Sequence, residues 1–429
     1  MAAQRNTLML ALTALLAGCV QDSGERAGPE ALLASSFAKT AGEQQTVVVN
    51  PDANGHGVAA TIQEGIDRVA PGGKVLVRPG VYPEAIVIDK GLTLEGIGDG
   101  GGPVVIAPEG TPIAAVAVTT SSPVTIRDLF VRFSGPVGIG GDGIVDVTIE
   151  RATVVAVNPP LGAGNVVIVQ NLGNVTGGRA RLVVRESFID GGVAFKNGPS
   201  PVFPQMFGIR PSGDVDAVIE RNVVRRTGGA CIHVVMRGDL GGETNADIVD
   251  NDLDECYPLG RAGALLVGTA FGGVPLVGTA TATGVVNIVG NTIRNSTGSC
   301  ILSSGINYEY FTGRIEHNRI LGTTLGCAIT TLRVMPAGIW VGSIRGLPGA
   351  TPVVRFNDIV GNAQAGLRIG PNVTATLDAS CNWYGSTSGP AGAGPGTGDA
   401  LVVQAGAATP VFAPFAATPI AGTGATSCD

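Results

Sequence analysis

The chain is poor in charged, histidine and aromatic side chains, and these shortages exclude several classes of protein. Charged residues make up 14% of the 429 residues, below the roughly one quarter found in ordinary globular proteins. The net charge is −7 without a basic cluster, which argues against nucleic-acid binding. His56, His233 and His317 are too scattered to indicate a zinc cluster or a nucleophile–base pair. His233 lies beside Cys231 in an apolar run and is interpreted as structural.

Helical periodicity is also missing between residues 74 and 390. Glycine, by contrast, reaches 66 residues, and Val and Ile dominate the apolar positions. Val and Ile favour strands, and frequent glycine favours short strands separated by turns. Short strands without crossover helices satisfy their backbone groups by stacking coil on coil.

One pattern recurs along the chain: an aliphatic residue, two polar residues, an Asn, a spacer and another aliphatic residue. The clear copies carry their Asn at Asn222, Asn251, Asn291, Asn318 and Asn357. Weaker copies place Ala152, Ser187 and Ser380 at the Asn position, and Ile97 and Leu129 begin the series. The mean spacing of about 31 residues is typical of solenoids. We therefore predict an all-β, right-handed parallel β-helix solenoid of about ten or eleven coils.

The repeated Asn is explained by an amide ladder inside the solenoid. Equivalent residues of stacked coils lie about 4.8 Å apart, so each amide can donate to one neighbour and accept from the other. Each bond contributes about 1 kcal/mol net, and a lone buried amide costs more. The alternative is that these asparagines occupy exposed turns.

Charges beside the predicted ladder alternate in sign from coil to coil. One position before the ladder the residues are Arg151, Glu186, Arg221 and Asp250, and two positions before it they are Glu150, Arg185 and Glu220. Opposite charges on adjacent strands stabilise a sheet, whereas like charges destabilise it. We interpret these charges as structural.

The N-terminus carries a targeting signal. Arg5 precedes a short apolar run, which is typical of a secretory signal, and the run ends in Leu16-Ala17-Gly18-Cys19. This ending resembles the lipobox of bacterial lipoproteins, which implies cleavage before Cys19, lipidation of its sulfur and, with Val20 next, sorting to the outer membrane. The predicted organisation is a signal peptide at 1–18, a flexible tether at 19–45 and the β-helix at 46–429. An ordinary cleaved signal is the alternative.

Six further cysteines suit disulfides in an oxidising compartment. Cys300 and Cys327 each lie nine residues after a ladder Asn, so adjacent coils would bring them within disulfide reach. Cys231 with Cys256 and Cys381 with Cys428 follow by elimination. Buried free thiols are the alternative.

A short helix is predicted at the start of the β-helix. Thr61 and Glu64 form a capping box, and Ile62, Ile66 and Val69 share one face. Such a helix would cover the open edge of the first coil.

Both ends of the predicted β-helix resemble known proteins. Residues 61–67, 75–84 and 92–96 resemble the opening of the pectin-lyase-like superfamily, which includes pectinesterases, and residues 381–385, 388–390 and 412–415 resemble the closing coil of secreted bacterial β-helix repeat proteins. The resemblance implies the fold and leaves the activity open. Gly80, Tyr82 and Glu84 fit a pectinesterase element that is structural in that family.

The catalytic elements of these relatives are not found. Ser187 replaces the nucleophilic Asp in the segment nearest to the pectinesterase motif, and the acid/base Asp motif is missing, although such an esterase needs both carboxylates. Gly55-His56-Gly57 matches one polygalacturonase element by chance, because its companion motifs are missing, and the alginate epimerase Asp-Pro-His-Glu is absent. We therefore lean against an enzyme.

No cofactor or metal is predicted, although one acidic run is compatible with Ca²⁺. The run consists of Asp247, Asp250, Asp252, Asp254 and Glu255, with Arg221, Arg225, Arg226 and Arg237 nearby. Pectate lyases, in the same superfamily, hold Ca²⁺ with acidic residues beside an Arg. A mutually paired coil surface is the interpretation that we favour.

Candidate ligand-binding residues lie where the spacing between ladder positions grows. The excess falls between the second strand of one copy and the first strand of the next, so inserts would project from one side. These inserts contain Phe207, Arg210, Tyr308, Tyr310, Phe311 and Trp340. Aromatic rings with polar neighbours suit the apolar faces of sugars, and covering the coil is their alternative role.

These observations predict an exported, lipid-anchored protein that binds a polysaccharide or a cell-surface partner without turnover. The first alternative is a polysaccharide lyase or hydrolase with an unfamiliar site. The second is a periplasmic accessory protein.

Overall fold

The computed structural model describes most of the chain from residue 44 onward. The described residues are 44–52, 58–98, 102–160, 162–172, 178–193, 205–236, 243–256, 265–269, 284–298, 304–325, 337–342, 351–420 and 428. The chain divides into the unit Met1–Glu43 and the compact unit Gln44–Asp429. Cys19, Cys300 and Cys327 lie outside the described residues, and so does the pairing predicted for Cys300 and Cys327.

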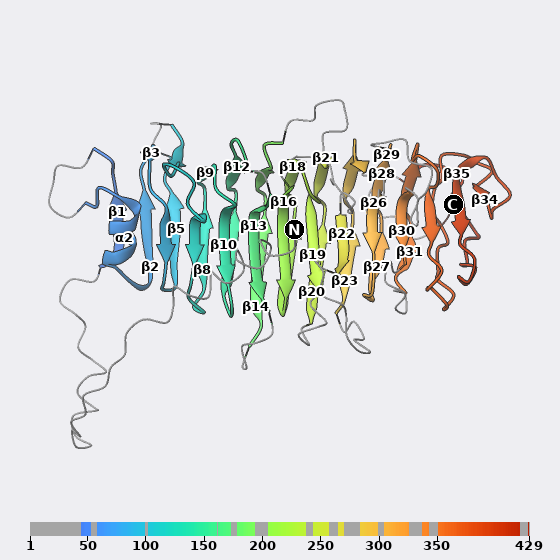
Figure 1. Cartoon of the computed structure of the whole chain (residues 1–429), viewed down its shortest axis with the longest axis horizontal. Helices are drawn as coiled ribbons and strands as arrows, with labels where there is room; N and C mark the ends of the chain where they lie inside the picture. Colours follow the sequence, from blue (N-terminus) through green and yellow to red (C-terminus); the bar gives the residue numbers. More distant parts are fainter. Residues whose placement is uncertain are drawn as a thin grey trace, which may run out of the picture. The chain divides into compact units, whose positions relative to one another are not determined.

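Three parallel sheets run along the unit Gln44–Asp429, with strands of successive coils side by side (Figure 1). Sheet A has 11 described strands: β1 (Gln44–Val49), β2 (Val69–Val77), β5 (Leu92–Gly96), β8 (Val124–Arg127), β11 (Asp146–Glu150), β14 (Ala180–Arg185), β17 (Val215–Glu220), β20 (Thr244–Val249), β23 (Val286–Val289), β27 (Arg314–Glu316) and β31 (Val353–Arg355). Sheet B has 10: β3 (Gly80–Tyr82), β6 (Val104–Ile106), β9 (Phe130–Phe133), β12 (Thr153–Ala156), β15 (Phe188–Asp190), β18 (Val223–Thr227), β21 (Asp252–Cys256), β24 (Thr292–Arg294), β28 (Arg319–Leu321) and β32 (Asp358–Val360).

Sheet C has 12 described strands and includes the closing strands of the unit. They are β4 (Ile86–Ile88), β7 (Ala114–Val118), β10 (Val137–Asp142), β13 (Ala163–Asn171), β16 (Gln205–Gly213), β19 (Ile232–Met236), β22 (Leu265–Thr269), β26 (Ser304–Tyr308), β30 (Ala337–Val341), β33 (Leu367–Ile369), β35 (Gly398–Val403) and β34 (Pro390–Gly392). The short strands β25 (Thr297–Gly298) and β29 (Thr324–Leu325) pair separately. This architecture confirms the predicted all-β parallel β-helix and its approximate number of coils.

The turn from sheet A to sheet B contains the amide ladder. Asn222 Nδ2 donates to Asn251 Oδ1 at 2.9 Å, and the same contact repeats from Asn251 to Asn291 and onward. The ladder continues through Asn318 and Asn357 to Asn382. The residue directly before the ladder position has a positive φ in successive turns. These residues are Arg151, Glu186, Arg221, Asp250, Gly290, His317, Phe356 and Cys381. This left-handed residue turns the chain sharply, so that the next side chain points inward.

One end of the predicted ladder needs correction. Ser380 is not its last member, because Asn357 Nδ2 donates to Asn382 Oδ1 at 2.9 Å and Ser380 bonds to Asp378 instead. At the other end Ser187 does occupy the column, since its backbone N donates to Asn222 Oδ1 at 3.0 Å.

Charged side chains on the outer face of sheet A pair across adjacent coils. Arg127 contacts Glu95 at 2.6 Å, and Arg185 contacts Glu150. In the column next to the ladder, Arg221 contacts Glu186 at 3.2 Å. The alternating charges therefore pair from coil to coil.

A single described helix, α2 (Ile62–Arg68), covers the first coil as predicted. Thr61 Oγ1 accepts from Glu64 N at 3.1 Å, which caps the helix. Glu84 accepts from the backbone N of Ile62 and Gln63, so this Glu satisfies two otherwise unpaired helical N–H groups. Among the described residues, no helix combines the length and apolar character needed to cross a bilayer.

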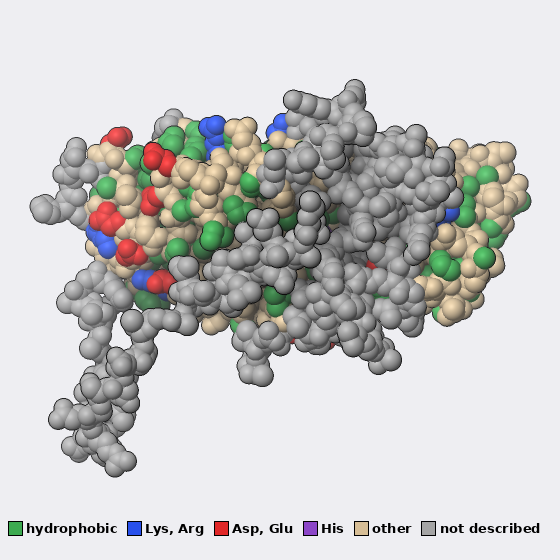
Figure 2. Space-filling model, in the orientation of Figure 1, with side chains coloured by type: hydrophobic (Ala, Val, Ile, Leu, Met, Phe, Trp, Pro, Cys, Tyr) green, Lys and Arg blue, Asp and Glu red, His purple; other side chains and the backbone are tan. Residues whose placement is uncertain are grey.

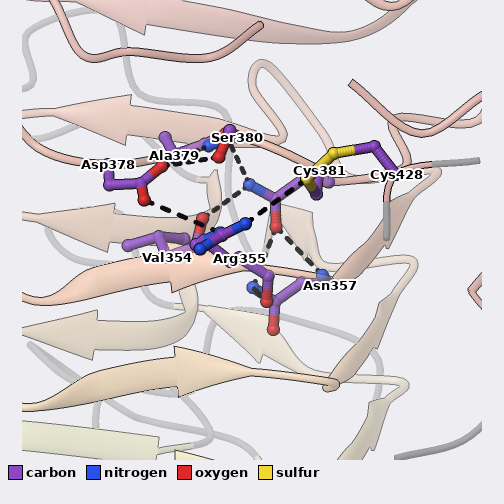
Figure 3. The surroundings of a disulfide bond; sticks show 9 residues. Val354, Arg355, Asn357, Asp378, Ala379, Ser380, Cys381 and Cys428 are labelled. Carbon is purple, nitrogen blue, oxygen red and sulfur yellow. Dashed lines mark hydrogen bonds and ion pairs between the residues drawn. A yellow bond between two sulfur atoms is a disulfide. The ribbon is translucent and has the colours of Figure 1, made fainter. Parts of the chain in front are cut away.

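Two of the three predicted disulfides lie within the described residues. Cys231–Cys256 links adjacent coils inside the core. Cys381–Cys428 ties the chain terminus to the closing coil, where the Arg355 side chain lies between Asp378 and Cys381 (Figure 3). Disulfides indicate an extracytoplasmic location.

Charged side chains are unevenly distributed on the face shown in Figure 2. Few of them are visible at the end with the closing coil, whereas acidic side chains gather near α2.

Candidate functional site

The outer face of sheet C carries a row of polar side chains in register. Strand pairing places Ile168 beside Arg210, His233 beside Leu266, Leu266 beside Asn307, Asn307 beside Trp340, and Trp340 beside Arg368. The adjacent residues Ile209, Ile232, Ile306, Ile339 and Leu367 belong to the core. Because side chains alternate along a strand, the row faces away from the core. We call Arg210, His233, Asn307, Trp340 and Arg368 the outer row.

Trp340 forms a small apolar cluster apart from the main core, together with Ala337, Ala365 and Val402. Its ring covers Gly342, where an added Cβ would approach Trp340 Cζ2 to 2.7 Å. Glycine is therefore required beneath the ring. Trp340 is buried, yet its Nε1 has no hydrogen-bond partner in the described structure.

Asn307 is also fully buried in the outer row. Ser304 Oγ donates to Asn307 Oδ1 at 2.7 Å, which fixes the orientation of the amide. Asn307 Nδ2 then has no acceptor among the described residues. A buried donor without an acceptor costs about 1–3 kcal/mol, so its retention points to a ligand.

Arg368 is the buried cation of the row, with 4% of its side chain exposed. Burial lowers the pKa of Arg368 from its ordinary value. Its Nε has no hydrogen-bond partner, and no carboxylate of the described residues forms an ion pair with it. An isolated charge removed from water is unfavourable unless something compensates it.

A second group lies earlier in the outer row. The Arg210 guanidinium lies 5.0 Å from the centroid of the half-buried Phe207 ring, and the Phe207 and His233 rings are 5.0 Å apart. Burial is the main cause that lowers the pKa of His233 well below its ordinary value, with a smaller contribution from Arg210. His233 is therefore neutral at physiological pH.

The structure does not place the predicted aromatic residues in projecting inserts. Tyr308 and Phe311 are fully buried in the main core, and Tyr310 is nearly so. The Tyr308 hydroxyl lies within hydrogen-bond distance of the backbone oxygens of Val286 and Thr312, and burial raises the pKa of this hydroxyl. These three rings pack in the core of the coil rather than in projecting inserts.

Phe207, Arg210 and Trp340 also lie in strands, namely β16 and β30, rather than in inserts. Long connections occur both before and after the strands of sheet C. One joins β15 of sheet B to β16 of sheet C, and another joins β22 of sheet C to β23 of sheet A. Sequence reasoning missed Asn307 and Arg368. The signal available for Arg368 is its position inside the alternating run 365–369, between Leu367 and Ile369.

The acidic run does not form a metal site in the described structure. Asp252 and Asp254 both contact Arg294, at 2.6 and 3.3 Å. Asp247 accepts from Asn287 Nδ2 at 2.8 Å. Among the described residues no group of three or more His, Cys, Asp or Glu side chains is arranged to hold a metal.

Three residues of the outer row, Asn307, Trp340 and Arg368, offer hydrogen-bond donors. An amide, an indole and a guanidinium each present an N–H without an acceptor, from the adjacent strands β26, β30 and β33. Such groups suit oxygen atoms of a ligand.

Comparison with known proteins shows likeness in fold alone. No family model matches the chain, and no curated protein matches its sequence. The A-module of mannuronan C-5 epimerase AlgE6 from Azotobacter vinelandii is 15% identical, with a TM-score of 0.49 over 81% of this chain and 94% of that one. Pectin methylesterase PemA from Erwinia chrysanthemi is 12% identical, with a TM-score of 0.35 over 66% and 91%. The GH136 lacto-N-biosidase from Eubacterium ramulus is 11% identical, with a TM-score of 0.40 over 88% and 70%. The parallel β-helix fold of the chain is established by its own sheet topology, and these comparisons assign it no family.

Proposed function

We propose that this protein binds a polysaccharide on the outer face of sheet C without turnover. The observation that supports the proposal is the outer row, in which buried N–H donors without acceptors recur on successive strands. Natural proteins rarely leave such groups unpaired, and ligand sites are a common reason.

A polymer fits this face better than a small molecule because the row extends over several coils. Neighbouring strands are about 4.8 Å apart, so the row from Arg210 to Arg368 spans roughly 24 Å. A sugar chain lying along the row would offer hydroxyl and ring oxygens at regular intervals. The Phe207 ring, half-buried at the start of the row, suits the apolar face of a sugar.

Binding without turnover follows from the catalytic motifs that the sequence does not contain. An esterase of the pectinesterase kind needs two carboxylates, and Ser187 stands where one of them would be. Ser187 is buried in the ladder column and donates its Oγ to Arg185 O at 2.8 Å, so it serves the fold.

The test is a binding titration of the purified exported protein with acidic and neutral polysaccharides. We expect saturable binding that weakens about tenfold in Phe207→Ala, because one aromatic contact is lost. Val81→Ala, which alters an exposed residue of β3, is the matched control and should bind normally. New reducing ends or unsaturated products would establish an enzyme instead. Absence of binding to every glycan would contradict the proposal and favour a protein partner.

We also propose that a lipid on Cys19 anchors the protein to the outer membrane, with residues 19–45 as a tether. The disulfides support export, since such bonds persist in oxidising compartments. Several acyl chains on one residue give stable anchoring. Metabolic labelling with a radioactive fatty acid should label the wild-type chain, and Cys19→Ala should remove the label. Labelling that survives this substitution would refute the anchor.

A further inference from the structure

We infer that Asn307, Trp340 and Arg368 form a subsite for an oxyanion of the ligand, that is, a carboxylate, sulfate or phosphate group. We call these three residues the oxyanion subsite. The inference rests on the proposed function for the ligand's location and adds the charge that the ligand must carry. It concerns the end of the outer row next to the closing coil.

The three residues lie side by side on sheet C because their strands are hydrogen-bonded neighbours. Asn307 is in register with Trp340, and Trp340 with Arg368. All three side chains leave the same face of sheet C, and each is more than nine-tenths buried. Adjacent strands are about 4.8 Å apart, so one ligand group can contact donors on two neighbouring strands.

The groups that the subsite leaves free can only donate hydrogen bonds. Ser304 occupies Asn307 Oδ1, so the free group of the amide is Nδ2. The indole has only an N–H, and the guanidinium has only N–H groups. An oxygen-rich acceptor fits all three, whereas a ligand donor would find no acceptor on these side chains.

Arg368 determines the sign of the charge. Several other described arginines form ion pairs with carboxylates; for example, Arg127 pairs with Glu95 and Arg294 pairs with Asp252. Arg368 has no such partner among the described residues although it is buried more deeply than either. A buried cation costs stability unless an anion compensates it, and the desolvated guanidinium binds carboxylate, sulfate and phosphate in two-pronged geometry.

Glu309 lies close to the subsite along the chain and needs consideration. It follows β26 two residues after Asn307 and is buried, with interactions of its own. Asn307, Trp340 and Arg368 lie in one row across the strands. Glu309 lies in the neighbouring row, because the pairing of Tyr308 with Val341 places Glu309 beside Gly342. The charged group of the ligand is therefore expected over Trp340 and Arg368, and Asn307 Nδ2 is left to donate to a neighbouring oxygen of the same ligand.

Trp340 provides a direct optical probe. The chain has two tryptophans, so Trp383→Phe leaves Trp340 as the sole indole. In this background we expect a saturable change of Trp340 fluorescence with inorganic sulfate and with both polyuronate and sulfated polysaccharide, and a much weaker response to neutral glycans. The preferred polymer identifies the oxyanion. Arg368→Met should weaken the response to anions about 100-fold, because a buried charge-assisted contact is lost.

The melting temperature of Arg368→Met should show how much the unpaired charge of Arg368 destabilises the protein. Without ligand, Arg368→Met should raise the melting temperature, because the change replaces an uncompensated buried cation with an apolar side chain. Sulfate should raise the melting temperature of the wild type and leave that of Arg368→Met unchanged. Arg294→Met is the matched control, since it removes a paired arginine and should retain the sulfate response.

Two outcomes separate this inference from the proposed function. Equal binding of neutral and anionic polysaccharides, unaffected by Arg368→Met, would overturn the oxyanion subsite and leave polysaccharide binding intact. A sulfate response that depends on Arg368, without binding of any polysaccharide, would support the subsite and contradict the proposed function. A lower melting temperature in Arg368→Met would overturn the inference, because it would show that the arginine stabilises the empty protein.

Discussion

Two buried asparagines, Asn291 and Asn307, show how differently the same residue is used in two regions. Both are fully buried. Asn291 Nδ2 donates to Asn318 Oδ1 and to Ile248 O, and its Oδ1 accepts from Asn251. Asn307 accepts from Ser304 and leaves its Nδ2 without a described acceptor.

The difference separates the architectural inside of the coil from the outer face of sheet C, for which we propose a binding role. A fully satisfied ladder inside the solenoid fixes the register of successive coils. Unsatisfied donors on the outer face of sheet C cost stability, and a protein retains such a cost where a ligand can repay it on binding. The comparison predicts opposite responses to substitution in the two regions.

The largest expected effect comes from breaking the ladder. Asn291→Ala removes five side-chain hydrogen bonds and leaves the buried backbone N–H of Asn251 without its acceptor, so we expect a loss of about 4 kcal/mol in the free energy of unfolding. Asn307→Ala should cost only about 1 kcal/mol, because the buried Ser304 hydroxyl loses its acceptor while the unsatisfied donor Asn307 Nδ2 disappears. Urea denaturation measures both. Similar losses for the two variants would erase the distinction between the regions.

A smaller effect should separate paired from unpaired arginines. Arg294 contacts Asp252 and Asp254 on the surface of sheet B, and such partly exposed pairs contribute less than about 1 kcal/mol. Arg294→Met should therefore lower stability slightly, whereas Arg368→Met should raise it. Thermal unfolding at low and high salt tests this, because salt should weaken only the Arg294 contribution. Equal shifts in the same direction would contradict the account.

The smallest effect concerns a second, shorter ladder near the closing coil. Asn362 Oδ1 accepts from Thr323 N, and Asn362 Nδ2 donates to Asp399. Burial is the first cause that raises the pKa of Asp399 above its ordinary 3.8, although hydrogen bonds from Asn362 and Gly361 oppose the shift.

The sign of the pH dependence follows from that shift. Between pH 3.8 and the raised pKa the folded chain holds a proton that the unfolded chain has released, so unfolding becomes easier as pH rises. Stability measured against pH should fall through this window in the wild type relative to Asp399→Asn. A relative gain of the wild type over the same range would show that the carboxylate is stabilised by its donors.

The ladder was predictable from sequence because its signal is local and periodic. Each Asn sits at a fixed offset within an aliphatic pattern, and charges beside it alternate. The prediction at Ser380 is wrong because the aliphatic residue three positions before the ladder amide is Ala379 rather than Leu377, so the ladder residue is Asn382. There Cys381 has a positive φ of 60°, as Arg221 has a positive φ of 53° in its own turn, and this makes Asn382 the next inward residue.

The outer row was less predictable because a sequence does not show which face of a strand is covered. Tyr308 and Trp340 each lie after the second strand signal of one copy and before the next copy, a position that predicts projecting inserts. In the coil Tyr308 points into the core and Trp340 lies on the opposite face, as the alternation from Ile306 and Ile339 requires. Register between distant strands, rather than any motif, brings Asn307, Trp340 and Arg368 together.

The most direct test of the account records both regions at once in ¹⁵N NMR spectra during titration with an acidic oligosaccharide. The account predicts that the indole N–H signal of Trp340 moves downfield to saturation, because it gains an acceptor, while the side-chain amide signals of Asn251, Asn291 and Asn318 stay in place. A stationary Trp340 signal under saturating ligand, or shifts confined to the ladder amides, would contradict the assignment of the outer face of sheet C as the binding surface.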